Sequence, residues 1–70
     1  MKTFGETLVM VMSEKNVRAK ELSELSGVSQ PYISQIVNGK LADPSFLRAA
    51  ALIKALGLSL DEFSKLQDAD

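Results

Sequence analysis

The sequence predicts an all-α fold of five short helices in one domain, and three kinds of observation lead to this prediction. Apolar residues recur three or four positions apart, capping residues precede these stretches, and glycine or asparagine follows them. A chain of 70 residues has room for a single core. It contains no cysteine and no histidine, so apolar packing must stabilise it without a disulfide or an ordinary zinc site.

The first two helices are expected to begin and end at local signals. Thr3 and Glu6 have the spacing of a capping box, and Asn16 suits a C-terminal turn. The apolar stripe of this first helix contains Phe4, Leu8 and Val11. A second helix should run from about Ala19 to Ser26, because Gly27 readily adopts the left-handed conformation that ends a helix. Its apolar residues are Leu22 and Leu25.

The third helix should begin after Ser29, which is a good N-cap, and Pro31 is tolerated only in its first turn. Its buried face is expected to contain Ile33, Ile36 and Val37. On a helical wheel the opposite face is uncharged and rich in hydrogen-bonding groups. This outer face consists of Pro31, Ser34, Gln35 and Asn38, with Gln30 at its N-terminal end.

The fourth and fifth helices complete the expected domain. Asp43 as cap and Pro44 at the first helical position should start the fourth helix, and Gly57 should stop it. Its inward residues are expected to be Phe46, Leu47, Ala50, Ile53 and Leu56. Ser59 and Glu62 form a second capping box, which opens a fifth helix with Leu60, Phe63 and Leu66. The domain is expected to span residues 1–66, with residues 67–70 as a frayed C-terminal tail.

The composition argues against an enzyme and against a membrane protein. The commonest general base and the best thiol nucleophile are absent, and the remaining polar residues form no phosphate loop or nucleophile elbow. No apolar run approaches the roughly 20 residues that cross a membrane, and the first residues lack the pattern of a secretory signal. We therefore expect a cytoplasmic protein that is not an enzyme, carries no cofactor and has no membrane partner.

The charge is distributed unevenly along the chain. The net charge is −1 and the isoelectric point is near 5.3, whereas a nucleic-acid-binding domain is commonly basic. Residues 15–40 nevertheless carry four basic and two acidic side chains, while from Gly57 onward four acidic side chains oppose one lysine. The middle of the chain is therefore expected to face phosphate, and the C-terminal part to face away from it.

Two short helices joined by a turn around Gly27 form either an ordinary αα-hairpin or a DNA-binding helix-turn-helix. Ser23 is small where the two helices must approach each other, and Val28 should anchor the turn. The exposed polar face falls on the second helix of the pair, which enters the major groove in DNA-binding proteins of this kind. This position favours the DNA-binding motif.

At these residues the chain resembles the Cro and lambda-type repressor family, also called the XRE family of helix-turn-helix regulators. The segments that carry the resemblance are Phe4-Gly5-x-x-Leu8, Glu21-Leu22-Ser23-Glu24, Gly27-Val28-Ser29, Tyr32-Ile33-Ser34-Gln35-Ile36, Asn38-Gly39-Lys40, Ala55-Leu56-Gly57-Leu58-Ser59 and Asp61-Glu62-Phe63. Each segment is weak alone, but together they occur in the family's order and spacing. The resemblance implies a lambda-repressor-like fold and binding to operator double-stranded DNA.

The resemblance also implies site residues. Base edges would be faced by Gln30, Pro31, Ser34 and Gln35, and glutamine can pair with adenine through two hydrogen bonds. Phosphates would be held by Arg18, Lys20, Tyr32, Asn38 and Lys40, partly through backbone N–H groups at the helix ends and in the Asn-Gly loop. Since one recognition helix reads a half-site, two copies would be needed, and the implied homodimer contact includes Leu58 and Leu60.

The chain departs from the family in several places. Ala19 stands where the family very often has glutamine, and the loop of residues 41–43 is apolar and acidic where phage repressors commonly carry lysine or arginine. Met12 and Val37 replace a buried ion pair, a change that is often neutral for stability. Val9 and Met10 lie away from the apolar stripe of the first helix, so we expect them to be exposed and to indicate a protein interface.

Three functions therefore stay open. The first is a phage-type regulator that binds operator DNA through its third helix. The second is an antirepressor or modulator of repression, which keeps the repressor fold but acts by binding another regulator protein. The third is an antitoxin that binds both DNA and a toxin.

Overall fold

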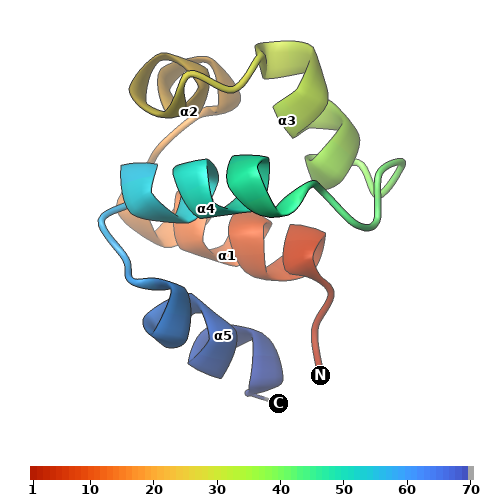
Figure 1. Ribbon diagram of the computed structural model, residues 1–70, viewed down its shortest axis with the longest axis vertical. Coiled ribbons are helices and arrows are strands. Elements are labelled where there is room, and N and C mark those ends of the chain that lie inside the picture. Colours follow the sequence, from red (N-terminus) through yellow and green to blue (C-terminus); the bar gives the residue numbers. More distant parts are fainter. Residues whose placement is uncertain (70) are drawn as a thin grey trace.

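The computed structural model describes residues 1–69, which form five helices and no strand (Figure 1). The helices are α1 (Phe4–Lys15), α2 (Ala19–Ser26), α3 (Gln30–Val37), α4 (Phe46–Ala55) and α5 (Leu60–Asp68). The predicted all-α fold is confirmed. No helix in this part of the chain combines the length and the apolar character needed to cross a membrane.

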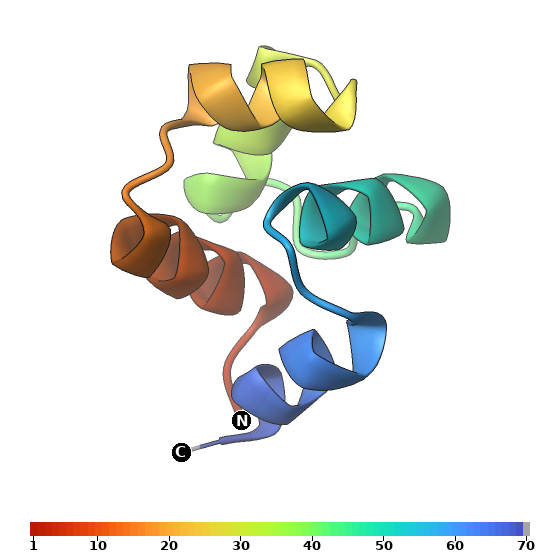
Figure 2. The same ribbon diagram turned by 90° about the vertical axis from the view of Figure 1, so that its left-hand side faces the viewer.

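The helices are arranged with α2 and α3 at one end of the molecule and α5 at the other (Figures 1 and 2). The helix α1 packs against α3 and α5, and α4 packs against α2 and α5. All five helices contribute to one apolar core, together with Val28 from the turn between α2 and α3. The buried apolar residues are Leu8, Val11, Met12, Leu22, Val28, Ile33, Ile36, Leu52, Ile53, Leu56 and Phe63.

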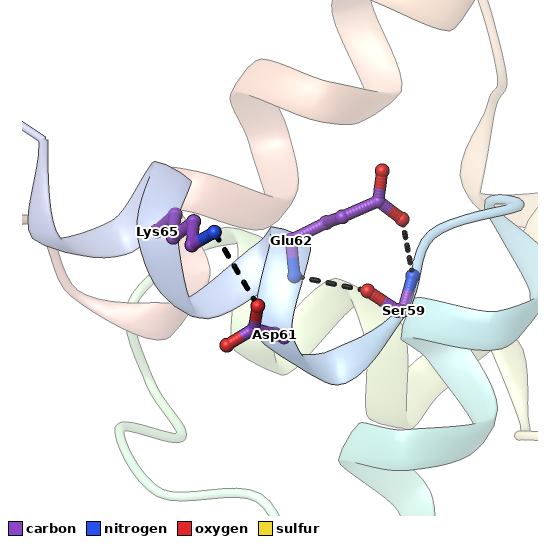
Figure 3. A network of polar contacts seen from close by, with 4 residues as sticks. All are labelled: Ser59, Asp61, Glu62 and Lys65. Atoms are coloured by element: carbon purple, nitrogen blue, oxygen red, sulfur yellow. Dashed lines mark hydrogen bonds and ion pairs between the residues drawn. The ribbon is translucent and has the colours of Figure 1, made fainter.

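Local capping signals fix most of the helix starts. Thr3 and Glu6 form the expected capping box of α1, and Ser29 accepts a hydrogen bond from the Tyr32 N–H of α3. A second box begins α5, where the Glu62 N–H donates to the Ser59 hydroxyl and the Ser59 N–H donates to the Glu62 carboxylate (Figure 3). The bond from the Ser59 backbone and the bond with its side chain lower the pKa of Glu62, because both favour the carboxylate.

The start of α4 differs from the sequence prediction. Asp43 and Pro44 remain in the loop, and the N-cap is Ser45, whose hydroxyl accepts a hydrogen bond from the Arg48 N–H. Serine caps a helix about as well as aspartate, and the Ser45 N–H is held by the Tyr32 hydroxyl oxygen at 3.1 Å. This long-range hydrogen bond favours a start after residue 45.

The buried residues of α4 also differ from the sequence prediction. The expected inward positions Phe46 and Leu47 are 72% and 80% exposed, so that prediction is wrong. The buried residues lie further along the chain and are Leu52, Ile53 and Leu56, of which Leu52 was not expected. Leu25, at the end of α2, is also exposed, whereas Leu22 is fully buried.

The C-terminal helix extends further than expected. The helix α5 continues to Asp68, and the Lys2 N–H donates to the Gln67 carbonyl oxygen at 2.9 Å. The Lys2 ammonium also donates to the Ala69 carbonyl oxygen at 2.8 Å. These bonds connect the two ends of the domain, so the expected fraying does not extend to residues 67 and 68. Asp70 lies outside the described residues.

Candidate nucleic-acid interface

The helix α3 lies beside α2 (Figure 1). Its exposed side chains form a short polar surface. Gln30, Pro31 and Gln35 are exposed, as expected for side chains that face base edges. Ser34 is half-buried, so it offers less of its side chain to a ligand than the sequence suggested. The surface is uncharged and contains two amide side chains that can each donate and accept hydrogen bonds.

The angle between α2 and α3 is fixed by buried residues and by a hydrogen-bonded turn. Leu22 from α2 and Ile33 from α3 are both fully buried, and Val28 lies between their helices in the chain. The Ser23 hydroxyl donates to the Val28 carbonyl oxygen at 2.6 Å, which gives this small residue a specific role in the turn. Gly27 has a φ of +77°, so the predicted left-handed end of α2 is confirmed.

Positively charged residues precede and follow α3 in the sequence. Arg18 and Lys20, at the start of α2, are exposed. Arg18 is the N-cap but supplies no side-chain capping bond, so the positive end of the α2 dipole adds to these two charges. Asn38, at the end of α3, and Lys40, in the following turn, are also exposed.

The backbone of the Asn-Gly turn contradicts one expectation. The Asn38 N–H donates to the Ser34 carbonyl oxygen at 2.9 Å, and the Lys40 N–H donates to the Gln35 carbonyl oxygen at 2.9 Å. The Gly39 N–H is likewise bonded within the chain, to the Ile36 carbonyl oxygen. Because these groups close the C-terminal end of α3, they do not serve as phosphate donors in this conformation, and only the side chains of Asn38 and Lys40 remain for that role.

Tyr32 lies at the junction of α3 and α4. Its side chain is half-buried, and its hydroxyl oxygen accepts the hydrogen bond from the Ser45 N–H. The guanidinium of Arg48 stands over its ring, with the Cζ atom 4.9 Å from the ring centroid. Arg48 was not expected at this surface, because its pairing with Tyr32 joins two helices that are separate in the sequence. The only signal was a single positive charge in the otherwise apolar segment of residues 46–53.

The expected protein interface on α1 is only partly exposed. Val9 is 40% exposed and borders a groove of about 350 Å³. The other residues that line this mainly apolar groove are Thr3, Gly5, Glu6, Ile36, Val37 and Gly39. Met10, in contrast, is half-buried and packs against the core, so the expectation that both residues face solvent is wrong. The reason is that α1 is covered by α3 and also by α5, which buries more than one stripe of the helix.

The residues named for a homodimer contact differ in accessibility. Leu58 is half-buried and packs against the core, whereas Leu60, at the start of α5, is 41% exposed. The same helix carries the exposed ion pair between Asp61 and Lys65, whose charged atoms are 3.5 Å apart (Figure 3). Since α5 lies at the opposite end of the molecule from α3, its acidic residues are far from the polar surface (Figure 2).

Comparison with known proteins places this geometry in a family. The model of the helix-turn-helix family HTH_3 matches residues 11–63, which is more than half of the chain. The matched segment includes all of α2, α3 and α4, and therefore the Gly27 turn and the polar surface of α3. A search among curated proteins finds no match.

Proposed function

Because the chain belongs to the helix-turn-helix family of Cro and lambda-type repressors, which are DNA-binding regulators, we propose that it is a phage-type transcriptional regulator that binds operator DNA through α3. The observation that carries this proposal is the exposed, uncharged face of α3, which is anchored to the core by the buried residues Leu22, Val28 and Ile33. A polar helix anchored in this way at one end of a small domain can enter the major groove.

In this proposal, side chains of α3 contact the base edges, and the positively charged residues before and after α3 bind the phosphates. The Gln35 amide pairs with an adenine through one donated and one accepted hydrogen bond, and Gln30 reads the neighbouring positions. Arg18 and Lys20 contact the backbone beside the start of α2, and Lys40 contacts it beyond the end of α3. Two copies bind an operator with two half-sites, and the exposed Leu60 belongs to the homodimer contact.

The substitution Gln35→Ala tests the reading role of α3. Duplexes that the wild-type protein enriches from a random-sequence library supply the cognate DNA. On this DNA we expect Gln35→Ala to lose about 1–3 kcal/mol of binding free energy and to relax the preference at one base pair. The melting temperature should not change, because the side chain is exposed.

Lys40→Ala is the matched control for this measurement, because it removes a charge from the same end of α3 without removing a base contact. It should weaken binding to all duplexes equally and lower the slope of log affinity against log salt concentration by about one unit. Unchanged affinity and unchanged base preference in Gln35→Ala would remove this residue from the readout.

A second candidate function is supported by the apolar surface of α1. An antirepressor or modulator that binds another regulator protein would use Val9 and the groove between α1 and α3. The acidic isoelectric point agrees with a protein partner better than with DNA alone. In this candidate Met10 has no direct role, because it packs against the core.

Val9→Glu tests the second candidate, with Ser13→Glu, at an exposed position of the same helix, as control. Both variants should fold with a change of at most about 0.5 kcal/mol in unfolding free energy. If α1 binds a regulator, pull-down from the native host should lose that protein with Val9→Glu only. Equal recovery with both variants would end this candidate.

A further inference from the structure

The contact between Tyr32 and Arg48 suggests that these two residues have different roles in DNA binding. At 4.9 Å from the ring centroid, the guanidinium is within the range of a cation–π interaction. Among residues 1–69 no carboxylate lies within ion-pair distance of Arg48, and its side chain is exposed. The ring therefore holds the guanidinium without neutralising it.

A guanidinium held in this way remains able to bind an anion. A contact with an aromatic face does not use its N–H donors, and these donors match two phosphate oxygens in a fixed fork. The Tyr32 hydroxyl is fixed as well, because its oxygen accepts the Ser45 N–H at the start of α4. Ring, backbone and guanidinium form one unit that joins the two helices.

The position of this unit relates it to the polar surface of α3. Tyr32 and Gln35 are three residues apart on the same helix, so their side chains are neighbours on its surface. Residues 41–47 contain Asp43 but no lysine or arginine, so Arg48 is the next positive charge after Lys40. On the side of α3 that faces α4, Arg48 is therefore the cation available to bind a phosphate next to the bases that α3 contacts.

We propose that Arg48 binds a DNA backbone phosphate and that Tyr32 is a positioning residue, which holds the Arg48 guanidinium and does not bind the phosphate itself. The proposal rests on the proposed function, since it assumes that α3 faces DNA. The family resemblance implies that Tyr32 is a phosphate ligand, whereas here Tyr32 positions the guanidinium of Arg48. Arg48 is thereby added to the residues that bind DNA.

A double-mutant cycle tests the proposal. The probe is a fluorescent duplex of about 20 base pairs with random sequence, about two helical turns, and its affinity is measured over a series of salt concentrations. Arg48→Ala should lower the slope of log affinity against log salt concentration by about one unit. Tyr32→Leu should weaken binding about twofold to fivefold in the wild-type background, but not in the Arg48→Ala background.

Two variants serve as controls. Tyr32→Phe keeps the ring and should restore most of the affinity, which a direct phosphate bond from the hydroxyl would not allow. Lys54→Ala removes an exposed charge near the other end of α4 and should leave the salt slope unchanged. Circular dichroism of each variant verifies folding. If Tyr32→Leu does not fold, Tyr32→Phe together with the comparison of Arg48→Ala and Lys54→Ala decides the question.

The outcomes separate this proposal from the proposed function. Suppose first that the wild-type protein binds the duplex in a salt-dependent way. An unchanged salt slope for Arg48→Ala, or equal effects of Tyr32→Leu in both backgrounds, would then overturn this inference and leave the proposed function intact. If Tyr32→Phe weakens binding equally in the wild-type and Arg48→Ala backgrounds, the hydroxyl acts as a phosphate ligand independently of Arg48, which would also overturn the inference. A wild-type protein that binds no duplex would overturn the proposed function and this inference with it.

Discussion

Gly5→Ala is expected to destabilise the domain, although alanine is the better helix former. Alanine normally stabilises a helix interior by about 0.5–1 kcal/mol relative to glycine. At this position, however, a Cβ atom would lie 2.6 Å from the backbone carbonyl oxygen of Ile36. The overlap involves backbone, so only a shift of α1 away from α3 relieves it. We expect a net loss of about 2 kcal/mol in the free energy of unfolding.

Urea denaturation followed by circular dichroism measures this effect. Ser13→Ala, at an exposed position of the same helix, is the control and should be neutral or slightly stabilising. The sign of the change in Gly5→Ala decides between helix propensity and packing. An increase in stability would mean that α1 and α3 do not approach each other as closely as described.

Phe63→Ala is expected to have the largest effect on folding. Phe63 is 2% exposed, and its ring centroid lies 5.0 Å from that of Phe4 with 39° between the ring planes. It is the fully buried residue of α5, so its removal takes away the main contact of this helix with the core. Deletion of a buried phenylalanine costs about 3–5 kcal/mol, which is close to the whole stability expected of so small a domain.

Phe46→Ala is the matched control, because the same side chain is removed from a site that is 72% exposed. Its unfolding free energy should change by at most about 0.5 kcal/mol. At 25 °C the helical circular dichroism signal of Phe63→Ala should be largely lost, while that of Phe46→Ala should remain. Similar losses in the two variants would contradict the burial described for α4 and α5.

Local signals in the sequence predicted most helix ends correctly. The capping boxes at Thr3 and Ser59, the N-cap at Ser29 and the left-handed Gly27 are all confirmed. Each of these features depends on hydrogen bonds or steric limits within about four residues, so the sequence contains the required information.

Burial was predicted less well, because it depends on helices that are distant in sequence. Phe46 and Met10 illustrate this in opposite directions: the first is exposed although it was expected in the core, and the second packs against the core although it was expected outside. Phe46 is on the first turn of α4, away from the buried residues Leu52 and Ile53, and the helix of Met10 is covered by both α3 and α5. Neither fact follows from periodicity within one helix.

The candidate site shows the same limit. The exposed amides of Gln30 and Gln35 followed from the helical wheel of α3. The pairing of Tyr32 with Arg48 did not, since these residues are on different helices and are brought together only in the folded chain. The internal hydrogen bonds of the Asn-Gly turn also required the folded backbone.

The central claim is that DNA binds to the face of α3, and NMR titration of the isotope-labelled protein with the enriched duplex tests it most directly. The backbone and side-chain amide signals of Gln30 and Gln35, and the amide signals near Lys40, should shift the most. Signals of α5, at the opposite end of the molecule, should change little. Shifts concentrated at Val9 and its groove, with α3 unaffected, would contradict the claim and would favour a protein-binding role for this fold.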